Sequence, residues 1–260
     1  MQNINLALDR DATDASNPKK WDAMFLHMEG ATKQLDNIVI DKDHKRKKGK
    51  GGLISQWEAD GDAKDSVGDN DGTLIGDATF APGIDNEAFS FDGNGDYVLV
   101  LDHASLGNTS AVTMSAWFKT SGTSPFSGIV GKMTPLEPRP GYLMSVDDSS
   151  KLRCDIIGPF GRTMQGQGTV VSATPVEDGA FHHGACAYDG TTVRVYVDGV
   201  LEGSVAYING VGSNNGQPLR IGRDAALQPN RDFNGLIDEV QIYGSALRAK
   251  NQENSRPGQR

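Results

Sequence analysis

The feature that most constrains this chain is a strict two-residue alternation of apolar and polar side chains in its second half. In the run TVRVYVDGV, Thr192 to Val200, the valines at 193, 195 and 197 fall on one face and Thr192, Arg194, Tyr196 and Asp198 fall on the other. Side chains of a β-strand point to opposite faces in turn, so this pattern predicts a strand with one buried face. The dipeptide Asp198-Gly199 tolerates the positive φ angles of a tight hairpin, which predicts a return strand beginning at Val200.

The same period recurs in two other segments. In 112–119 one face carries Val112, Met114, Ala116 and Phe118, and the other carries Thr113, Ser115, Trp117 and Lys119. In 236–243 the pattern places Leu236, Asp238, Val240 and Ile242 together, against Ile237, Glu239, Gln241 and Tyr243. A carboxylate within an apolar row is costly unless something neutralises it, so Asp238 is a candidate functional residue.

Composition agrees with a fold made of many strands. The chain has 260 residues and 32 glycines, and helix-forming runs are scarce after Gly52. This length suits one large β-domain with an appendage. We therefore expect an all-β protein, an antiparallel β-sandwich jelly roll, preceded by an N-terminal α-helical arm.

Residues 1–52 form the predicted arm. Asn17-Pro18 is a good helix start, because Asn caps and Pro suits the first helical position. Apolar residues then recur at spacings of three and four along one stripe: Trp21, Met24, Phe25, Met28, Ala31 and Leu35. The basic run that ends at Lys50 reads as an exposed linker, with a patch that grips an acidic surface or nucleic acid as the alternative.

The rest of the chain resembles a known family. The run FHHGACAYDGTTVRVYVDGVLEG (181–203) is similar to the corresponding block of the laminin-G-like (concanavalin A-like) jelly-roll domains. The family's other blocks are also present, in the family's order along the chain: DGTLIGDATFAPG, FSFDGNGDYVLV, TMSAWFKT, PLRIGR and FNGLIDEVQIY. The resemblance covers 53–247 and implies a jelly roll there, followed by a polar tail, 248–260. It implies a fold rather than a ligand, because the scaffold serves lectins, adhesins, accessory domains and structural modules.

Catalysis is disfavoured. Related jelly rolls that cleave polysaccharides carry E-x-D-x-x-E along one strand, so that two carboxylates flank the scissile bond. None of the eight glutamates stands in that pattern, and no G-x-S-x-G elbow is present. The adjacent pairs Asp147-Asp148 and Asp238-Glu239 should point to opposite faces of a strand. We expect a protein that is not an enzyme.

Calcium is the metal that the sequence supports best. The loop Asp60 to Asp71 is rich in carboxylates and glycines, although its spacing does not fit an EF-hand. In related jelly rolls an early loop and the late I-D-E-V strand meet at a structural calcium, so the resemblance implies Asp238 with Asp60 or Asp65 as ligands. Alternatively, backbone N–H groups or an arginine such as Arg220 hold Asp238. His182 and His183 should diverge, which favours a structural role for both.

Three further features leave alternatives open. Trp117 stands on the polar face of its strand, where it can stack on a sugar ring, but an ordinary core position is the simpler interpretation. Cys154 and Cys186 each lie in a predicted strand; buried free thiols are the simpler interpretation and a cross-strand disulfide is the alternative. The loops 134–141 and 159–168 are where ligand specificity would reside.

Charge and the chain's first residues point to a class of function. Residues 53–260 carry a net charge of −11, which argues against nucleic acid and membrane as partners of the jelly roll, whereas residues 1–52 carry +2. No segment is long and apolar enough to span a membrane, and the N-terminus lacks the features of a signal peptide.

These features predict a non-catalytic binding or display module. The interpretation that we prefer is a phage virion surface protein: a decoration protein, head fibre or tail appendage. Its segment 1–52 would attach to capsid or tail proteins or self-associate, and its jelly roll would bind a glycan or a surface. The alternatives are an extracellular, secreted carbohydrate-binding or adhesion protein, a structural spacer without a ligand, and a glycan hydrolase.

Overall fold

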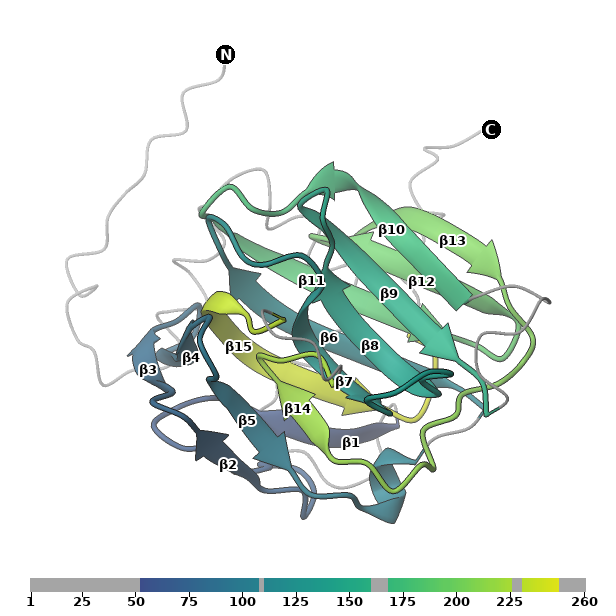
Figure 1. Cartoon of the computed structure of the whole chain (residues 1–260), viewed down its shortest axis with the longest axis horizontal. Helices are drawn as coiled ribbons and strands as arrows, with labels where there is room; N and C mark the ends of the chain where they lie inside the picture. Colours follow the sequence, from purple (N-terminus) through teal and green to yellow (C-terminus); the bar gives the residue numbers. More distant parts are fainter. Residues whose placement is uncertain (1–51, 108–109, 160–167, 226–230, 248–260) are drawn as a thin grey trace, which may run out of the picture.

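The computed structural model describes residues 52–107, 110–159, 168–225 and 231–247. Within these ranges the chain forms two antiparallel β-sheets packed face to face, with no α-helix (Figure 1). The expected all-β sandwich is therefore confirmed. The predicted N-terminal helix with its apolar stripe, the basic linker and the C-terminal tail lie outside the described residues.

One sheet, called sheet A, has eight strands in the order β13-β12-β11-β6-β15-β4-β3, with β1 paired to β15. Its strands are β1 (Leu53–Trp57), β3 (Thr79–Pro82), β4 (Glu87–Asp92), β6 (Val112–Lys119), β11 (Phe181–Tyr188), β12 (Thr192–Val197), β13 (Val200–Ala206) and β15 (Asn234–Tyr243).

The other sheet, called sheet B, has seven strands in the order β10-β9-β8-β7-β14-β5-β2 and lies in front of sheet A in Figure 1. Its strands are β2 (Gly72–Ile75), β5 (Tyr97–Val100), β7 (Ser127–Met133), β8 (Gly141–Val146), β9 (Lys151–Ile157), β10 (Gly168–Pro175) and β14 (Leu219–Ile221). A short 3-10 turn, η1 (Ala104–Leu106), follows β5.

The core fills the space between the sheets, and two of the predicted alternations are confirmed. The apolar rows of β6 and β12 are buried in the main core cluster. The predicted hairpin between β12 and β13 is also present: Asp198 and Gly199 adopt φ angles of 49° and 81°. These left-handed conformations suit the right-handed twist of the flanking strands, which explains the Asp-Gly pair.

The alternation predicted for β15 is wrong, because the strand contains a β-bulge. Ile237 pairs with Phe118 and Asp238 with Trp117, but the register then slips before Gln241 pairs with Ser115. Glu239, within the slip, has a φ of 50°. The extra residue shifts the side-chain alternation, so Ile237 and Val240 both enter the core.

As a consequence, Asp238 leaves the apolar row in which the sequence pattern placed it. It stands opposite Trp117, on the outer face of sheet A, and not with Val240 and Ile242. Glu239 turns toward that side as well, where Gln56 Nε2 donates a hydrogen bond to its Oε2 at 2.9 Å. The expectation that these adjacent carboxylates point to opposite faces is therefore also wrong.

The two cysteines are joined, so the simpler interpretation of two free thiols is wrong. Cys154 of β9 and Cys186 of β11 form a disulfide with Cα atoms 5.7 Å apart. The bond crosses the core and connects sheet B to sheet A. Sequence alone could not establish this, because the two strands belong to different sheets and only their packing brings the sulfurs together.

Across the described ranges, no helix has the length and apolar character needed to cross a membrane.

Candidate functional site

The first candidate site lies on the outer face of sheet A, around Trp117. On this face Trp117 pairs with His183 of β11 on one side and Asp238 of β15 on the other. Trp117 is only half-buried and belongs to no core cluster, so the interpretation of Trp117 as core is wrong. The His183 ring packs edge-on against the indole, with centroids 5.3 Å apart. Trp117 is therefore held in place while part of its surface meets solvent.

A second aromatic ring lies close to Trp117. Phe181 is half-buried and pairs with Lys119, two residues along β6 from Trp117. Diagonal cross-strand neighbours of this kind lie within about 7–8 Å of each other. The Lys119 ammonium sits 5.7 Å from the centre of the Phe181 ring. We call Trp117, Lys119 and Phe181 the aromatic platform.

His183 supports the platform from within. It is 2% exposed, and burial lowers the pKa of its imidazole to about 4, so the ring is neutral at neutral pH. Its Nδ1 atom has no hydrogen-bond partner. The backbone N–H of His183 donates to Asp198 Oδ1 at 2.8 Å, which ties the strand to the β12–β13 hairpin.

The neighbouring histidine has a different environment. His182 Nδ1 lies 2.8 Å from Asp198 Oδ2, and its Nε2 lies 3.2 Å from Asp178 Oδ1. The hydrogen bond to Asp198 is the largest contribution that raises the pKa of His182 above its usual value. Its ring approaches Phe118, on the core side of β6, whereas His183 approaches Trp117 on the outer side. The two rings diverge, and each has a structural contact.

Asp238 is fully buried beneath the loop between β3 and β4. Its Oδ2 accepts backbone N–H groups from Ile84 at 2.8 Å and Asp85 at 3.2 Å, whereas its Oδ1 has no hydrogen-bond partner. Burial raises the pKa of Asp238 to about 7. Backbone amides thus hold the Oδ2 atom of Asp238, which is one of the partners that the sequence analysis proposed. The other proposed partner, Arg220, lies in sheet B and does not contact Asp238.

Only one of the two loop aspartates predicted beside Asp238 lies near it. Asp60 is close enough for its charge to help raise the pKa of Asp238, and it also accepts hydrogen bonds from Asn86 Nδ2 and the Glu87 backbone. Asp65 instead organises its own loop. Its Oδ1 accepts the backbone N–H groups of Gln56, Val67 and Gly68, and its Oδ2 accepts that of Asn70.

Glu239 completes an acidic cluster with Asp60 and Asp238. Burial, followed by the charge of Asp238, raises the pKa of Glu239 to about 8. Asp238 is buried, Glu239 is half-buried and Asp60 is exposed. Neighbouring carboxyl groups destabilise each other's ionised forms, so Asp238 and Glu239 favour either bound protons or a nearby cation.

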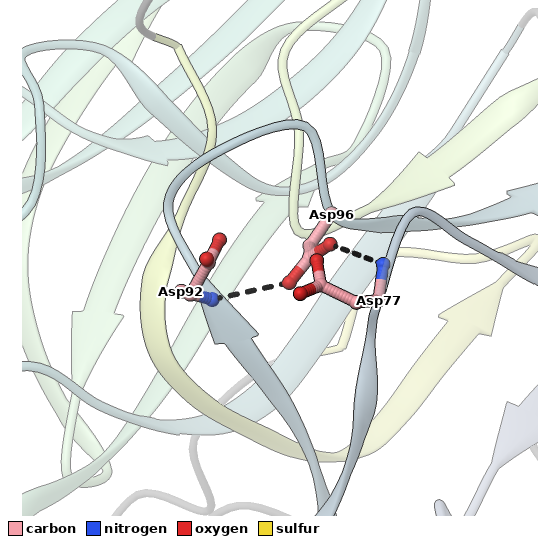
Figure 2. A group of neighbouring side chains, drawn as sticks. All are labelled: Asp77, Asp92 and Asp96. Atoms are coloured by element: carbon pink, nitrogen blue, oxygen red, sulfur yellow. Dashed lines mark hydrogen bonds between the residues drawn. The ribbon is translucent and has the colours of Figure 1, made fainter.

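A second group of carboxylates was not predicted as a site. Asp77, Asp92 and Asp96 place ligand atoms within 4.8 Å of one another, next to the turn between β4 and β5 (Figure 2). Asp96 is buried, and its carboxylate accepts the backbone N–H groups of Asp77 at 2.9 Å and Asp92 at 3.3 Å. Burial raises the pKa of Asp96. The sequence FDGNGD contains two of the three residues, but only the fold adds Asp77. Because both carboxylate oxygens of Asp96 accept backbone N–H groups, we interpret its role as holding the turn between β4 and β5 in place.

Comparison with known proteins identifies the family to which this fold belongs. The family model described as the concanavalin A-like lectin/glucanases superfamily matches residues 92–251. Among curated proteins, no sequence matches this chain.

Solved structures share the fold. Domain 4 of AbnA, a GH43 extracellular arabinanase from Geobacillus stearothermophilus in complex with arabinotriose, is 21% identical with a TM-score of 0.59, over 75% of this chain and 93% of that chain. The binding domain of Paraclostridial Mosquitocidal Protein 1 is 18% identical with a TM-score of 0.59, over 75% and 49%. A structure of botulinum neurotoxin type C, whose cell entry depends on interaction with two ganglioside molecules, is 11% identical with a TM-score of 0.53. The match covers 75% of this chain and 48% of that chain. This chain spans about half the length of the two toxin chains. At these identities the likeness concerns the fold.

The contacts of His182 predict a pH-dependent contribution to stability. Because its folded pKa is raised, the charged pair with Asp198 stabilises the fold most below about pH 6.5, the usual histidine pKa, and this stabilisation is lost as pH rises through the folded pKa. We therefore expect the melting temperature of His182→Gln to fall below that of the wild type most at about pH 6, with a smaller difference at about pH 8.5. Calorimetry of both proteins across this range measures it. His183 is present in both proteins and cancels in the difference; a gap that stays constant with pH would contradict the assignment.

Proposed function

This chain belongs to the concanavalin A-like lectin/glucanase superfamily, and from that premise we propose that it is a non-catalytic carbohydrate-binding module. The observation that carries the proposal is the aromatic platform on sheet A. Trp117 and Phe181 are half-buried diagonal neighbours, and the imidazole of His183 packs against the edge of the indole. Partly exposed aromatic rings held on a rigid sheet offer apolar faces to sugar rings, with Lys119 as a donor beside them.

The structural relatives support a binding role. Domain 4 of the arabinanase was solved with arabinotriose. The match in the mosquitocidal protein is its binding domain, and the cell entry of botulinum neurotoxin type C depends on gangliosides. Each of these domains has the same sandwich. The proposal for this chain adds the place of binding, which is the outer face of sheet A at Trp117.

The position of Asp238 supports a non-catalytic role. It is the carboxylate paired in register with Trp117, yet it is fully buried, and backbone N–H groups of Ile84 and Asp85 hold its Oδ2. A glycosidase needs two carboxyl groups that reach the scissile bond from either side. A carboxyl group covered by main chain does not reach a saccharide on the platform.

Replacing Trp117 tests the platform. Trp117→Ala should weaken binding of a neutral oligosaccharide by about 1–3 kcal/mol, the range of aromatic residues at binding hot spots. Candidate ligands come from a glycan array that includes arabinotriose, and titration calorimetry measures the affinity. Tyr97→Ala, which removes a half-buried aromatic from sheet B, is the matched control and should bind as the wild type does. If no neutral glycan binds the wild type and Trp117→Ala only lowers the melting temperature, the platform is structural.

We further propose a structural calcium ion at the acidic cluster of sheet A. Asp238 and Asp60 would hold it, because Asp238 Oδ1 is buried without a hydrogen-bond partner and the Asp60 charge lies nearby. Calcium takes carboxylate and carbonyl oxygens, and its charge would relieve the repulsion between these carboxylates. The ion would tie the first loop after β1 to β15.

Chelation tests the calcium proposal. Calcium that binds only the folded state stabilises it by about 2.7 kcal/mol when the free ion is at 100 times its Kd. The wild type should therefore melt at a higher temperature in calcium than in chelator, and Asp238→Ala should lose the difference. Asp77→Ala, in the other acidic group, should keep it. A wild-type midpoint that does not respond, or a response that survives in Asp238→Ala, would remove the proposal.

The finer proposal concerns where the module works. We propose that residues 1–52 attach it to a phage virion, through capsid or tail proteins or through self-association, so that the β-sandwich faces outward. The support is the stripe of Trp21, Met24, Phe25, Met28 and Leu35 in the sequence. Such a stripe on an isolated helix is unstable in water until something covers it. An extracellular adhesion protein is the alternative location.

Truncation tests the anchor. A chain that begins at Leu53 should stay folded and soluble but should no longer self-associate or attach, because burial of each large apolar side chain of the stripe contributes about 1.5–3 kcal/mol before ordering costs. Light scattering gives the mass of both chains, and co-sedimentation with the parent particle gives attachment. A full-length chain that is monomeric and attaches no better than the truncated one would contradict the anchor.

A further inference from the structure

Part of the outer face of sheet A is buried, although sheet B packs against the opposite, inner face. β6 and β11 pair in the middle of this sheet, and away from Trp117 their outward side chains are small. Thr113 pairs with Ala187, and Ser115 pairs with Ala185. All four are buried. Taller neighbours can shade such small side chains, so their burial alone does not show that anything lies over them.

The burial of Tyr196 is harder to explain. Tyr196 of β12 pairs with Ala185, so it stands on the same outer face, yet it is only 5% exposed. Within the described residues, its cluster of buried apolar side chains contains only Ala185 and Ala187. A buried side chain ordinarily touches about 6–12 other residues. Two methyl groups can flank a phenol ring but cannot cover its outward side, so the burial of Tyr196 indicates a further covering segment.

The other neighbours of Tyr196 on this face do not supply the cover. Arg194, two residues before it on β12, directs its guanidinium to Asp189, with Nη1 2.7 Å from Oδ2. Leu201, which pairs with Tyr196 from β13, is itself 50% exposed. The strands beside Tyr196 therefore do not account for its burial.

The chain crosses onto this face after β15. The Thr113 hydroxyl donates to the backbone carbonyl of Ser245 at 2.7 Å, and it accepts the backbone N–H of Leu247 at 2.9 Å. Thr113 points outward from β6, so these two hydrogen bonds fix the backbone of Ser245 and Leu247 against the outer face of the sheet. Residues 248–260 continue from this point.

The distance from Leu247 to Tyr196 is short for such a segment. From β6, where Leu247 is held, Tyr196 lies two strands away, and neighbouring strands are about 4.8 Å apart. An extended chain spans about 3.3 Å per residue, so about four residues beyond Leu247 reach Tyr196. The remainder of 248–260 can continue along β11 and β12.

The N-terminal segment 1–51 is a less suitable cover. It also reaches sheet A near this corner, because the Gly244 N–H donates to the Gly52 carbonyl at 2.8 Å. However, it enters at β1, which lies on the far side of β15 from β6. It would have to cross both β15 and β6 before it met Tyr196, whereas Leu247 is already held at β6.

We propose that residues 248–260 dock on the outer face of sheet A, beside Ala185 and Ala187 and over the ring of Tyr196. The small side chains of β6 and β11 let a main chain lie close to the sheet, and the tyrosine ring packs against it. The docked segment covers the Thr113 end of this face and leaves the Trp117 end open to solvent. The proposal does not depend on glycan binding at the aromatic platform.

Hydroxyl-radical footprinting of the full chain, read by mass spectrometry, tests the proposal at Tyr196. We expect slow modification of Tyr196 in the wild type. A chain of the same length in which residues 248–260 are replaced by glycine and serine should lose this protection, because the segment that covers the ring is gone. Tyr188, which is fully buried in the core, should stay protected in both and so reports that the sandwich remains folded.

Thr113→Val gives a second test in the full chain. It removes both hydrogen bonds to the chain after β15 and nearly keeps the shape of the side chain. Loss of one hydrogen bond corresponds to a factor of about five in an equilibrium, so modification of Tyr196 should rise by about fivefold or more. Thr120→Val is the matched control. Thr120 is also buried, directly after β6, but its hydroxyl accepts the Gly122 N–H, so Tyr196 should stay protected.

Four outcomes would overturn the proposal. Tyr196 could be modified rapidly in the wild type, or it could stay protected in the glycine-serine chain. A chain that begins at Leu53 could lose the protection, which would assign the cover to residues 1–51. The protection could also rise with protein concentration, which would assign it to a second copy of the chain. If Tyr188 loses its protection in one of the two variants, the other variant decides.

Discussion

The pairing of β15 with β6 is the contact on which the rest of sheet A depends. β15 forms one side of its hydrogen-bond ladder with β6 and the other with β4 and then β1, so it joins strands from the beginning and the middle of the chain. Without it, the backbone groups of β6, β4 and β1 would face solvent or core without partners. Within this pairing the bulge at Glu239 decides which side chains enter the core and which face outward. Position 238 becomes an outer-face site because of one extra residue.

The two outer faces of the sandwich differ in chemistry although they enclose the same core. Sheet A presents two aromatic rings and an acidic cluster of which only Asp238 is buried, and sheet B presents arginines that pair with Asp155 and Asp224. The core, with its disulfide between β9 and β11, supplies rigidity to both. Side chains on paired strands keep fixed separations, so a ligand that binds there meets groups already in position.

Buried polar atoms without partners mark both faces. His183 Nδ1 and Asp238 Oδ1 lie on sheet A, and Ser145 Oγ and Arg220 Nη1 lie on sheet B. Each such atom destabilises the fold, by an amount comparable to a lost hydrogen bond of about 1–3 kcal/mol. The proposed calcium ion would give Asp238 Oδ1 the partner that it lacks within the chain.

The sequence by itself determined the strands and much of the core. Alternation identified the buried rows of β6 and β12, and Asp198-Gly199 identified the hairpin, because the strand period and the left-handed conformation are local properties. The resemblance predicted the family. The alternation in 236–243 singled out Asp238, although the row in which it placed that residue was wrong. These inferences need no knowledge of which strands become neighbours.

Only the tertiary structure decided which face each side chain takes and what it meets there. The bulge in β15 follows Asp238 and turns Val240 and Ile242 into the core, so Asp238 stands alone on the side of Trp117, since one extra residue shifts every later side chain to the other face. The bond between Cys154 and Cys186 joins strands of different sheets, and Arg139 and Arg231 meet at Asp224 from loops far apart in the chain. Such contacts depend on strand order and sheet packing, which bring residues together across long sequence separations, whereas a periodic pattern reports only the neighbours along one strand.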